Sequence, residues 1–178
     1  MNVKIRVLTL DDLDDMVRVE AESWEPELRA SRKTMEERLK RFPEGALGAY
    51  VNENGKMRLA GMTYAHRIGY LRETWYENSC KEAFDPNGKI LYIINVGVSS
   101  KYRGQGIGSK LLDKNKELAK KLGCEKICLG ARNTAGNLKF YKKNGFVVKK
   151  IVRDFWIEDK ASKGKGIIME YIVFTTSS

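Results

Sequence analysis

The sequence predicts an α/β protein with about seven strands and four or more helices. Apolar, β-branched runs alternate with stretches whose apolar residues recur at helical spacing. A strand, a glycine-rich turn and an amphipathic helix follow one another between Ile90 and Gly123. The predicted order is one strand, two helices, three strands, a helix, a strand, a helix and two strands.

The N-terminal half is predicted to supply the first strands and two helices. Alternation marks an opening strand, and Thr9 before two aspartates marks a helix start. A turn at Asn54-Gly55 predicts a hairpin. The predicted ranges are a strand at Val3–Leu8, a helix to about Ser23, a helix at Ser31–Phe42, and strands at Ala46–Val51 and Met57–Ile68. We expect a short helix within Arg72–Ala83, inside a long connection.

The remaining elements follow the same signals. Ile90–Val98 is an apolar run bounded by turn residues, and the helix after the glycine turn ends near Gly123. Strands are expected at Lys126–Ala131, Val147–Ile157 and Ile167–Phe174, with a helix around Phe140 and Tyr141.

Composition suits one domain over residues 1–178. The chain has 33 basic and 23 acidic residues and a net charge of +10. A basic excess suits nucleic acid, an anionic membrane or an anionic small ligand. The basic clusters fall on several elements, and no nucleic-acid recognition motif is present. With no apolar run of membrane-span length and no signal-peptide core, we expect a cytoplasmic protein without a membrane partner. A homodimer is left open.

A glycine turn that opens a helix is an anion site. The first amides of a helix have no internal partner, and the helix dipole adds partial positive charge there. Glycine lets a phosphate approach the backbone, Arg103 supplies a cation, and Ser109 adds a hydroxyl. The turn therefore predicts a ligand with a phosphate or pyrophosphate.

The spacing of this turn excludes two common phosphate motifs. A Walker loop needs GxxxxGK[ST], and a dinucleotide fingerprint needs a third glycine where Ser109 stands. What fits is Arg-x-x-Gly-x-Gly at Arg103, Gly106 and Gly108. Together with Asn133 and the downstream Phe-Tyr-Lys-Lys-Asn-Gly-Phe at 140–146, it resembles the GNAT superfamily of acyl-CoA-dependent N-acetyltransferases.

The resemblance implies a mixed, strongly twisted sheet whose fourth and fifth strands splay apart to admit pantetheine. It implies acetyl-CoA as cosubstrate, no metal, and direct attack of a primary amine on the thioester. The acceptor is left open among a small amine, a polyamine, an amino acid and a protein N-terminus. The alternatives are a non-catalytic acyl-CoA sensor and a basic nucleic-acid-binding module.

The resemblance also implies the cofactor residues. The backbone of Val96 and Val98 should pair with the pantetheine arm, and Gly97 between them allows either a bulge or close packing. Asn133 or Asn137 should bind the amide arm, and either one could cap the next helix instead. The full cofactor set is Val96, Gly97, Val98, Arg103, Gly104, Gln105, Gly106, Ile107, Gly108, Ser109, Asn133, Asn137 and Tyr141.

Three residues are the catalytic candidates. By resemblance, Tyr141 reaches the CoA sulfur and donates to the leaving thiolate. The arylalkylamine branch of the superfamily carries two histidines on the fourth strand, where this chain has Tyr92 and Ile94. His66 is the one histidine, and it is either a base acting through water or a structural residue. Glu22 and the acidic residues of the long connection, Glu73, Glu77, Glu82 and Asp85, are further candidates to bind a cationic amine or to relay its proton.

The cysteines do not predict a metal site. Cys80, Cys124 and Cys128 are an odd number, and the last two have no histidine near them in sequence. We expect buried free thiols.

Overall fold

The computed structural model describes residues 2–71, 82–156 and 162–174. These residues form a seven-stranded mixed sheet in the order β1-β2-β3-β4-β5-β7-β6. The strands are β1 Val3–Val7, β2 Ala46–Glu53, β3 Lys56–Ile68, β4 Ile90–Val98, β5 Lys126–Arg132, β6 Val147–Trp156 and β7 Gly164–Ile172. The α-helices are α1 Leu13–Ser23, α2 Arg32–Arg41, α4 Ile107–Lys121 and α5 Ala135–Lys143. Short 3-10 turns lie at Leu10–Asp12, Pro26–Leu28, Pro43–Gly45 and Ser100–Tyr102. The predicted fold class and element order are confirmed.

The chain divides into two compact units. Unit 1 contains Met1–Ala65 and Asn95–Asn115, and unit 2 contains His66–Ile94 and Lys116–Ser178. Strands β3 and β4 and helix α4 contribute residues to both units. The single domain expected over residues 1–178 stays a prediction. The short helix expected within Arg72–Ala83 lies largely outside the described residues.

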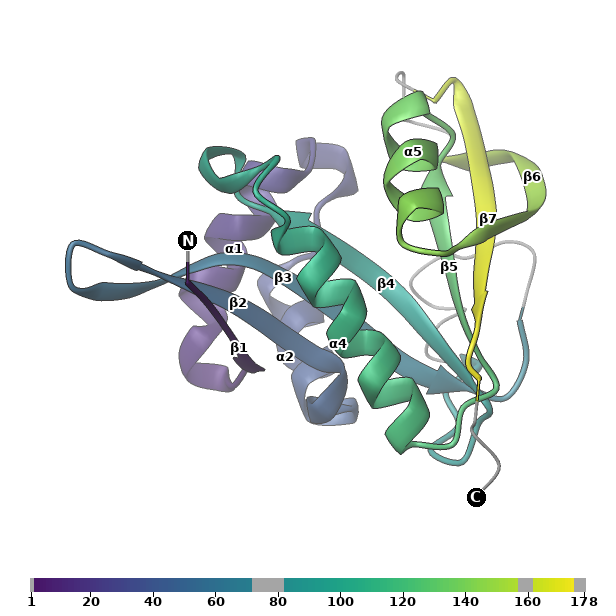
Figure 1. The fold of residues 1–178 in the computed structure, drawn as a ribbon, viewed down its shortest axis with the longest axis horizontal. Coiled ribbons are helices and arrows are strands. Elements are labelled where there is room, and N and C mark those ends of the chain that lie inside the picture. Colours follow the sequence, from purple (N-terminus) through teal and green to yellow (C-terminus); the bar gives the residue numbers. More distant parts are fainter. Residues whose placement is uncertain (1, 72–81, 157–161, 175–178) are drawn as a thin grey trace. The chain divides into compact units, whose positions relative to one another are not determined.

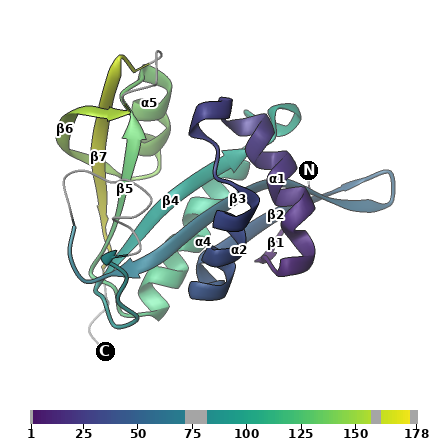
Figure 2. The ribbon, with the colours of Figure 1, turned by 180° about the vertical axis from the view of Figure 1, so that it is seen from behind.

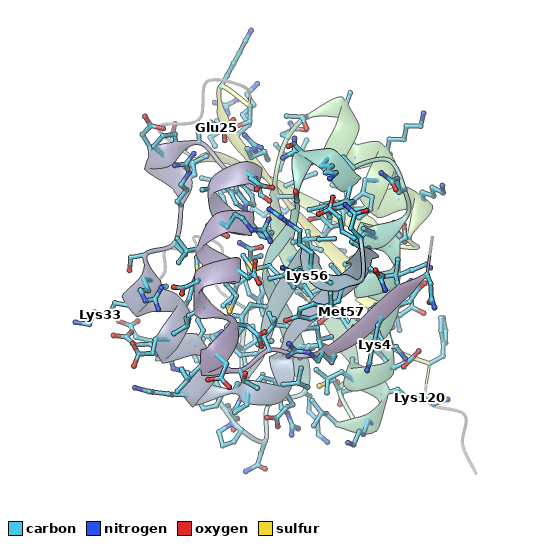
Figure 3. All side chains as sticks on the ribbon, turned by 90° about the vertical axis from the view of Figure 1, so that its left-hand side faces the viewer. Lys4, Glu25, Lys33, Lys56, Met57 and Lys120 are labelled. Atoms are coloured by element: carbon cyan, nitrogen blue, oxygen red, sulfur yellow. The ribbon has the colours of Figure 1, made fainter. Side chains whose placement is uncertain are left out.

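In unit 1, β1 and β3 pair antiparallel on either side of β2. The β2–β3 turn forms because Asn54 and Gly55 both take positive φ, at 52° and 84°, the conformation that a two-residue hairpin requires. The hairpin extends well past the neighbouring strand (Figure 1), with Lys56 and Met57 near its tip (Figure 3).

Helices cover both faces of this part of the sheet. Helices α1 and α2 lie on one face, and the first half of α4 lies on the other (Figures 1 and 2). The hydroxyl of Ser31 caps α2 by accepting a hydrogen bond from the Thr34 amide at 3.1 Å. Helix α4 buries Ile107 and Leu111 in an apolar cluster with Leu47, Ala49, Val51, Ala60 and Tyr102. This packing fixes the start of α4, where the glycine turn ends.

In unit 2, β5 lies parallel to β4 and antiparallel to β7, which also pairs with β6. The β4–β5 register within this unit runs from Ile90 opposite Lys126 to Ile93 opposite Leu129. One face carries an apolar cluster of Ile68, Ala83, Tyr92, Cys128, Val152, Phe155 and Ile168. The splaying expected farther along β4 and β5 stays a prediction.

Candidate functional site

The glycine turn has the backbone conformation that glycine permits. Gly104 and Gly106 adopt φ of +74° and +80°, in the left-handed region. A Cβ at either position would meet no atom of the described residues within 4 Å, so conformation and not crowding makes glycine necessary there. Both residues are exposed, and the Lys110 amide makes the first α4 bond, to the Gly106 carbonyl at 3.1 Å. The amides of the first α4 turn therefore stand at an open glycine turn, as an anion site requires.

Arg103 anchors this turn as well as carrying charge. Its Nε donates to the Val98 carbonyl at 3.1 Å, and its Nη2 donates to the Glu22 carbonyl at 2.8 Å. We expected Arg103 to serve as a cation beside a phosphate. The structure adds a positioning role, because the guanidinium ties the turn to the end of β4 and the end of α1. Gln105 closes the loop, donating from Nε2 to the Lys101 carbonyl at 3.2 Å.

The end of α1 contacts β4 and the residue that follows it at several points, which we call the α1–β4 seam: Glu20, Glu22 and Ser23 against Asn95, Gly97 and Ser99. Asn95 Nδ2 donates to Glu20 Oε2 at 2.7 Å. Burial would raise the pKa of Glu22, but hydrogen bonds from Ser99 and Arg18 outweigh it and lower that pKa. The seam therefore holds the segment that precedes the glycine turn.

Gly97 is tightly packed at this seam. A Cβ on Gly97 would lie 3.0 Å from Ser23 Oγ and 3.4 Å from Asn95 Oδ1, while the Gly97 carbonyl lies 3.0 Å from the Cβ position of Gly61. Close packing, one of the two alternatives left open for Gly97, therefore accounts for the glycine. Val96 and Val98 are half-buried.

A buried polar network crosses unit 1. The Asn95 carbonyl accepts a hydrogen bond from Thr63 Oγ1 at 2.8 Å, and Thr63 Oγ1 accepts one from Asn115 Nδ2 at 3.3 Å. Asn115 also donates to the Leu111 carbonyl of its own helix at 3.0 Å. With Glu20 behind Asn95, polar side chains run from α1 through β4 and β3 to α4. The sequence analysis missed Glu20, Asn95, Thr63 and Asn115, although an asparagine inside the apolar run of β4 was a usable signal.

Tyr141 lies on α5 in unit 2. Its ring packs edge-on against Phe140 and Phe146, with centroids 4.9 Å and 5.9 Å away. Burial raises the pKa of Tyr141 to about 12. Its hydroxyl makes no hydrogen bond to any residue that the structure describes. The phenol therefore stays protonated at neutral pH and keeps a donor to offer.

The two asparagines near the start of α5 differ in their bonding. Asn137 Nδ2 donates to the Arg132 carbonyl at 3.0 Å. The side chain of Asn133 has no hydrogen bond within the described ranges. The backbone N–H of Asn133 donates to the Lys165 carbonyl at 3.0 Å. Thr134 caps α5 by accepting from the Asn137 amide at 3.3 Å. The alternative in which Asn133 or Asn137 caps the helix is therefore wrong, because the hydroxyl between them takes that position.

Tyr92 and His66 are buried in unit 2. Tyr92 is 4% exposed and belongs to the apolar cluster with Cys128 and Phe155. His66 is fully buried, with its ring centroid 5.7 Å from that of Phe84. The catalytic roles of both stay predictions. Tyr92, His66, Asn133, Asn137 and Tyr141 belong to unit 2, and the candidates from Val96 to Ser109 belong to unit 1.

Cys124 and Cys128 are buried free thiols, as expected. Among the described residues, no group of three or more His, Cys, Asp or Glu side chains is placed to hold a metal ion. Over the same residues, no helix combines the length and apolar character that crossing a membrane requires.

The glycine turn, the mixed sheet and the strand–turn–helix order together define a class of acyl-transferring enzymes. The model of the acetyltransferase (GNAT) family matches residues 10–146. The chain therefore belongs to the acetyltransferase (GNAT) family and is an acyltransferase.

Three similar proteins illustrate the likeness. The uncharacterized N-acetyltransferase YkwB of Bacillus subtilis strain 168 is 25% identical over 197 residues, covering 94% of this chain and 87% of that protein. The structure of the GphF GNAT-like decarboxylase in complex with isobutyryl-CoA superposes with a TM-score of 0.83 at 24% identity, covering 96% of this chain and 100% of that one. The loading GNATL domain of CurA from Lyngbya majuscula gives a TM-score of 0.82 at 16% identity, covering 97% of this chain and 98% of that one.

Proposed function

We propose that this chain transfers an acetyl group from acetyl-CoA to a primary amine. The observation that carries the proposal is the open turn at Gly104 and Gly106, whose positive φ values lead into the first turn of α4, where backbone amides have no partner within the helix. The diphosphate of coenzyme A supplies the anion that such a turn binds. The isobutyryl-CoA in the GphF complex supports an acyl-CoA ligand for this fold.

The other cofactor contacts follow from the same proposal. The backbone of Val96 and Val98 pairs with the pantetheine arm as an added strand would. Of the two asparagines, Asn133 is the better candidate to bind an amide of that arm, because the Asn137 side chain already bonds the Arg132 carbonyl. Arg103 holds the turn in place and adds positive charge near the diphosphate.

In the chemical step, the amine nitrogen forms a bond to the thioester carbon, the C–S bond breaks, and its electron pair leaves on sulfur. The nitrogen releases a proton to a base, for which His66 and Tyr92 are the candidates. Tyr141 donates a hydrogen bond to the thiolate. With its pKa near 12 and that of the thiol near 8.5, complete proton transfer from Tyr141 is unfavourable, so the tyrosine stabilises the thiolate as a donor.

Two measurements test the proposal. Isothermal titration at low ionic strength should give saturable binding of CoA and acetyl-CoA. Thiol release should then require both acetyl-CoA and an amine, tested with n-butylamine, putrescine and an unblocked pentapeptide. Binding without thiol release would favour the sensor, and a thermal shift with nucleic acid but not with CoA would favour the nucleic-acid module.

A decarboxylase is a second candidate, favoured by the similarity to the GphF GNAT-like decarboxylase. Such an activity would release CO₂ from an acyl-CoA that carries a carboxylate, without any amine. Malonyl-CoA is the simplest probe, because losing CO₂ converts it to acetyl-CoA. Mass spectrometry of the CoA products with and without amine distinguishes the two reactions.

The acceptor class, the cytoplasmic location and the homodimer are also proposals. The amine panel orders small amines, polyamines and peptides by kcat/KM. Sedimentation equilibrium tests the dimer.

A further inference from the structure

Two polar atoms without partners converge beside Gly97. Ser23 Oγ and Asn95 Oδ1 are shielded from solvent, and neither has a hydrogen-bond partner among the residues that the structure describes. They lie 3.0 Å and 3.4 Å from the position that a Cβ on Gly97 would occupy. Both therefore lie beside Gly97, on the side where this residue carries no side chain.

Glu20 determines which way the Asn95 amide faces. Its carboxylate accepts hydrogen bonds and cannot donate them when ionised, so the NH₂ group of Asn95 must face Oε2, 2.7 Å away. The Ala30 amide holds the other Glu20 oxygen at 2.9 Å. Glu20 is 3% exposed and Asn95 is 7% exposed, so neither side chain is free to turn into water. Asn95 Oδ1 is consequently a fixed acceptor directed toward Gly97.

The chemistry of these atoms selects the ligand. Asn95 Oδ1 only accepts, and the Ser23 hydroxyl can accept as well as donate, so the ligand must bring N–H or O–H donors. A buried acceptor that lacks a donor is costly, which favours a ligand that supplies one. An amino group supplies at least two donors. A hydroxyl supplies only one donor, so two neighbouring acceptors favour an amino group over a hydroxyl.

We propose that Asn95 Oδ1 and Ser23 Oγ bind the nitrogen of the acceptor amine, with Glu20 as the residue that positions Asn95. This inference rests on the proposed function and specifies its acceptor site. Gly97 lies between Val96 and Val98, the residues proposed to pair with the pantetheine arm. The amine nitrogen would therefore lie next to the strand segment that holds the thioester.

A neighbouring cavity limits the direction of entry. It has about 10 Å³ of space and is lined by Leu8, Met16, Glu20, Met35, Arg38, Met62, Thr63, Tyr64 and Asn95. That volume suits one water molecule and is too small for the carbon chain of an amine. The substituent must instead leave on the side of Ser23, which is half-exposed.

The test compares Ser23→Ala and Asn95→Leu with the control Thr63→Val. Thr63→Val removes a buried hydroxyl that also bonds Asn95, at its backbone carbonyl, and leaves Oδ1 and Ser23 intact. Thiol release is measured against n-butylamine and an unblocked pentapeptide at saturating acetyl-CoA, and CoA binding is measured by calorimetry. We expect the KM for amine to rise about tenfold or more in both variants, with CoA affinity within about twofold of wild type. Thr63→Val should keep the amine KM within about twofold.

An unchanged KM for the amine in Ser23→Ala would overturn the inference and leave the proposed function standing. Ser23→Ala tests the site even if Asn95→Leu does not fold. Equal rises in the KM for amine and for acetyl-CoA would overturn it as well. So would a crystal structure with CoA and n-butylamine in which water alone occupies the space beside Gly97. If wild type bound acetyl-CoA but released no thiol with any amine, the proposed function would fail together with the inference.

Discussion

The hydroxyl of Tyr50 donates to Asp12 Oδ1 at 2.7 Å, joining β2 to the turn that starts α1. Two guanidinium nitrogens of Arg6 donate to the same carboxylate, at 2.7 Å and 2.8 Å. The Thr9 backbone amide donates a fourth hydrogen bond at 2.8 Å. Asp12 is 8% exposed. One buried carboxylate therefore connects β1, α1 and β2.

Replacing Asp12 by asparagine should destabilise the protein by about 2–3 kcal/mol at pH 7, because charge-assisted bonds to Arg6 and Tyr50 are lost. Urea denaturation measures this. The matched control is Asp14→Asn, which removes an ion pair between the exposed Asp14 and Arg32. That change should cost less than about 1 kcal/mol.

The cost of Asp12→Asn should depend on pH. Burial would raise the pKa of Asp12, but hydrogen bonds from Arg6, Tyr50 and the Thr9 amide outweigh it and hold that pKa well below its usual value. An unfolded aspartate titrates near pH 3.9. Because the folded pKa is lowered, the stabilisation is complete above about pH 5 and declines as pH falls below about 4. The difference between wild type and variant should shrink from pH 5 to pH 3, and a constant difference would contradict the assignment.

Alanine at Gly104 or Gly106 should weaken CoA binding. Their φ values of +74° and +80° cost an L-residue about 1–2 kcal/mol, and no neighbouring atom would clash with the added methyl. The substitutions should raise the Kd for CoA about tenfold by disordering the turn. Gly136→Ala is the control, since Gly136 lies in α5 and also has nothing within 4 Å of its Cβ position. That change should leave CoA binding unaltered and stabilise α5 by up to about 1 kcal/mol.

Tyr141→Phe should lower kcat by about tenfold to a hundredfold and change the Kd for CoA by less than about twofold. The reason is that the variant loses the donor to the thiolate and keeps the aromatic packing against Phe140 and Phe146. Tyr171→Phe, a half-buried tyrosine that packs on Phe146 in the same unit, is the control. Absorbance titration should show Tyr141 ionising near pH 12, because burial raises its pKa to about that value. Ionisation at pH 10 would mean that solvent reaches the Tyr141 hydroxyl freely and would contradict the raised pKa.

Cys128 should resist alkylation in the folded protein. Burial raises the pKa of Cys128 to about 11, so the thiolate is about a thousandfold rarer than the thiol at pH 8. Iodoacetamide treatment followed by peptide mass mapping should modify Cys128 in urea and spare it in buffer. Rapid labelling in buffer would mean that β5 opens locally.

Local signals were enough for the elements and for the glycine turn. The prediction for β4 matches its observed bounds, Ile90–Val98, because a short β-branched run between turn residues favours a strand over a helix. The roles expected of Gly104 and Gly106 depend on their own φ angles, which glycine adopts without the strain that a Cβ would cause. The resemblance of this pattern to a family motif then predicted acetyl-CoA as the cosubstrate.

Side-chain partners were much harder to predict. Arg103 was read as a phosphate cation, and its bond to the Glu22 carbonyl spans 81 residues. Thr134, which caps α5, escaped notice between two asparagines. Tyr92 became a candidate because it stands where the arylalkylamine branch carries a histidine. Only the packing of the folded chain showed that it belongs to the apolar cluster with Cys128.

By itself, the sequence determined the order of strands and helices, the left-handed glycine turn before α4, and membership in a family that transfers acyl groups. These features depend on residues close together in the chain. Only the tertiary structure decided that Glu20 meets Asn95 across 75 residues and directs its amide oxygen toward Gly97. Burial and contact between distant segments arise when helices pack on the sheet, and no local spacing encodes them.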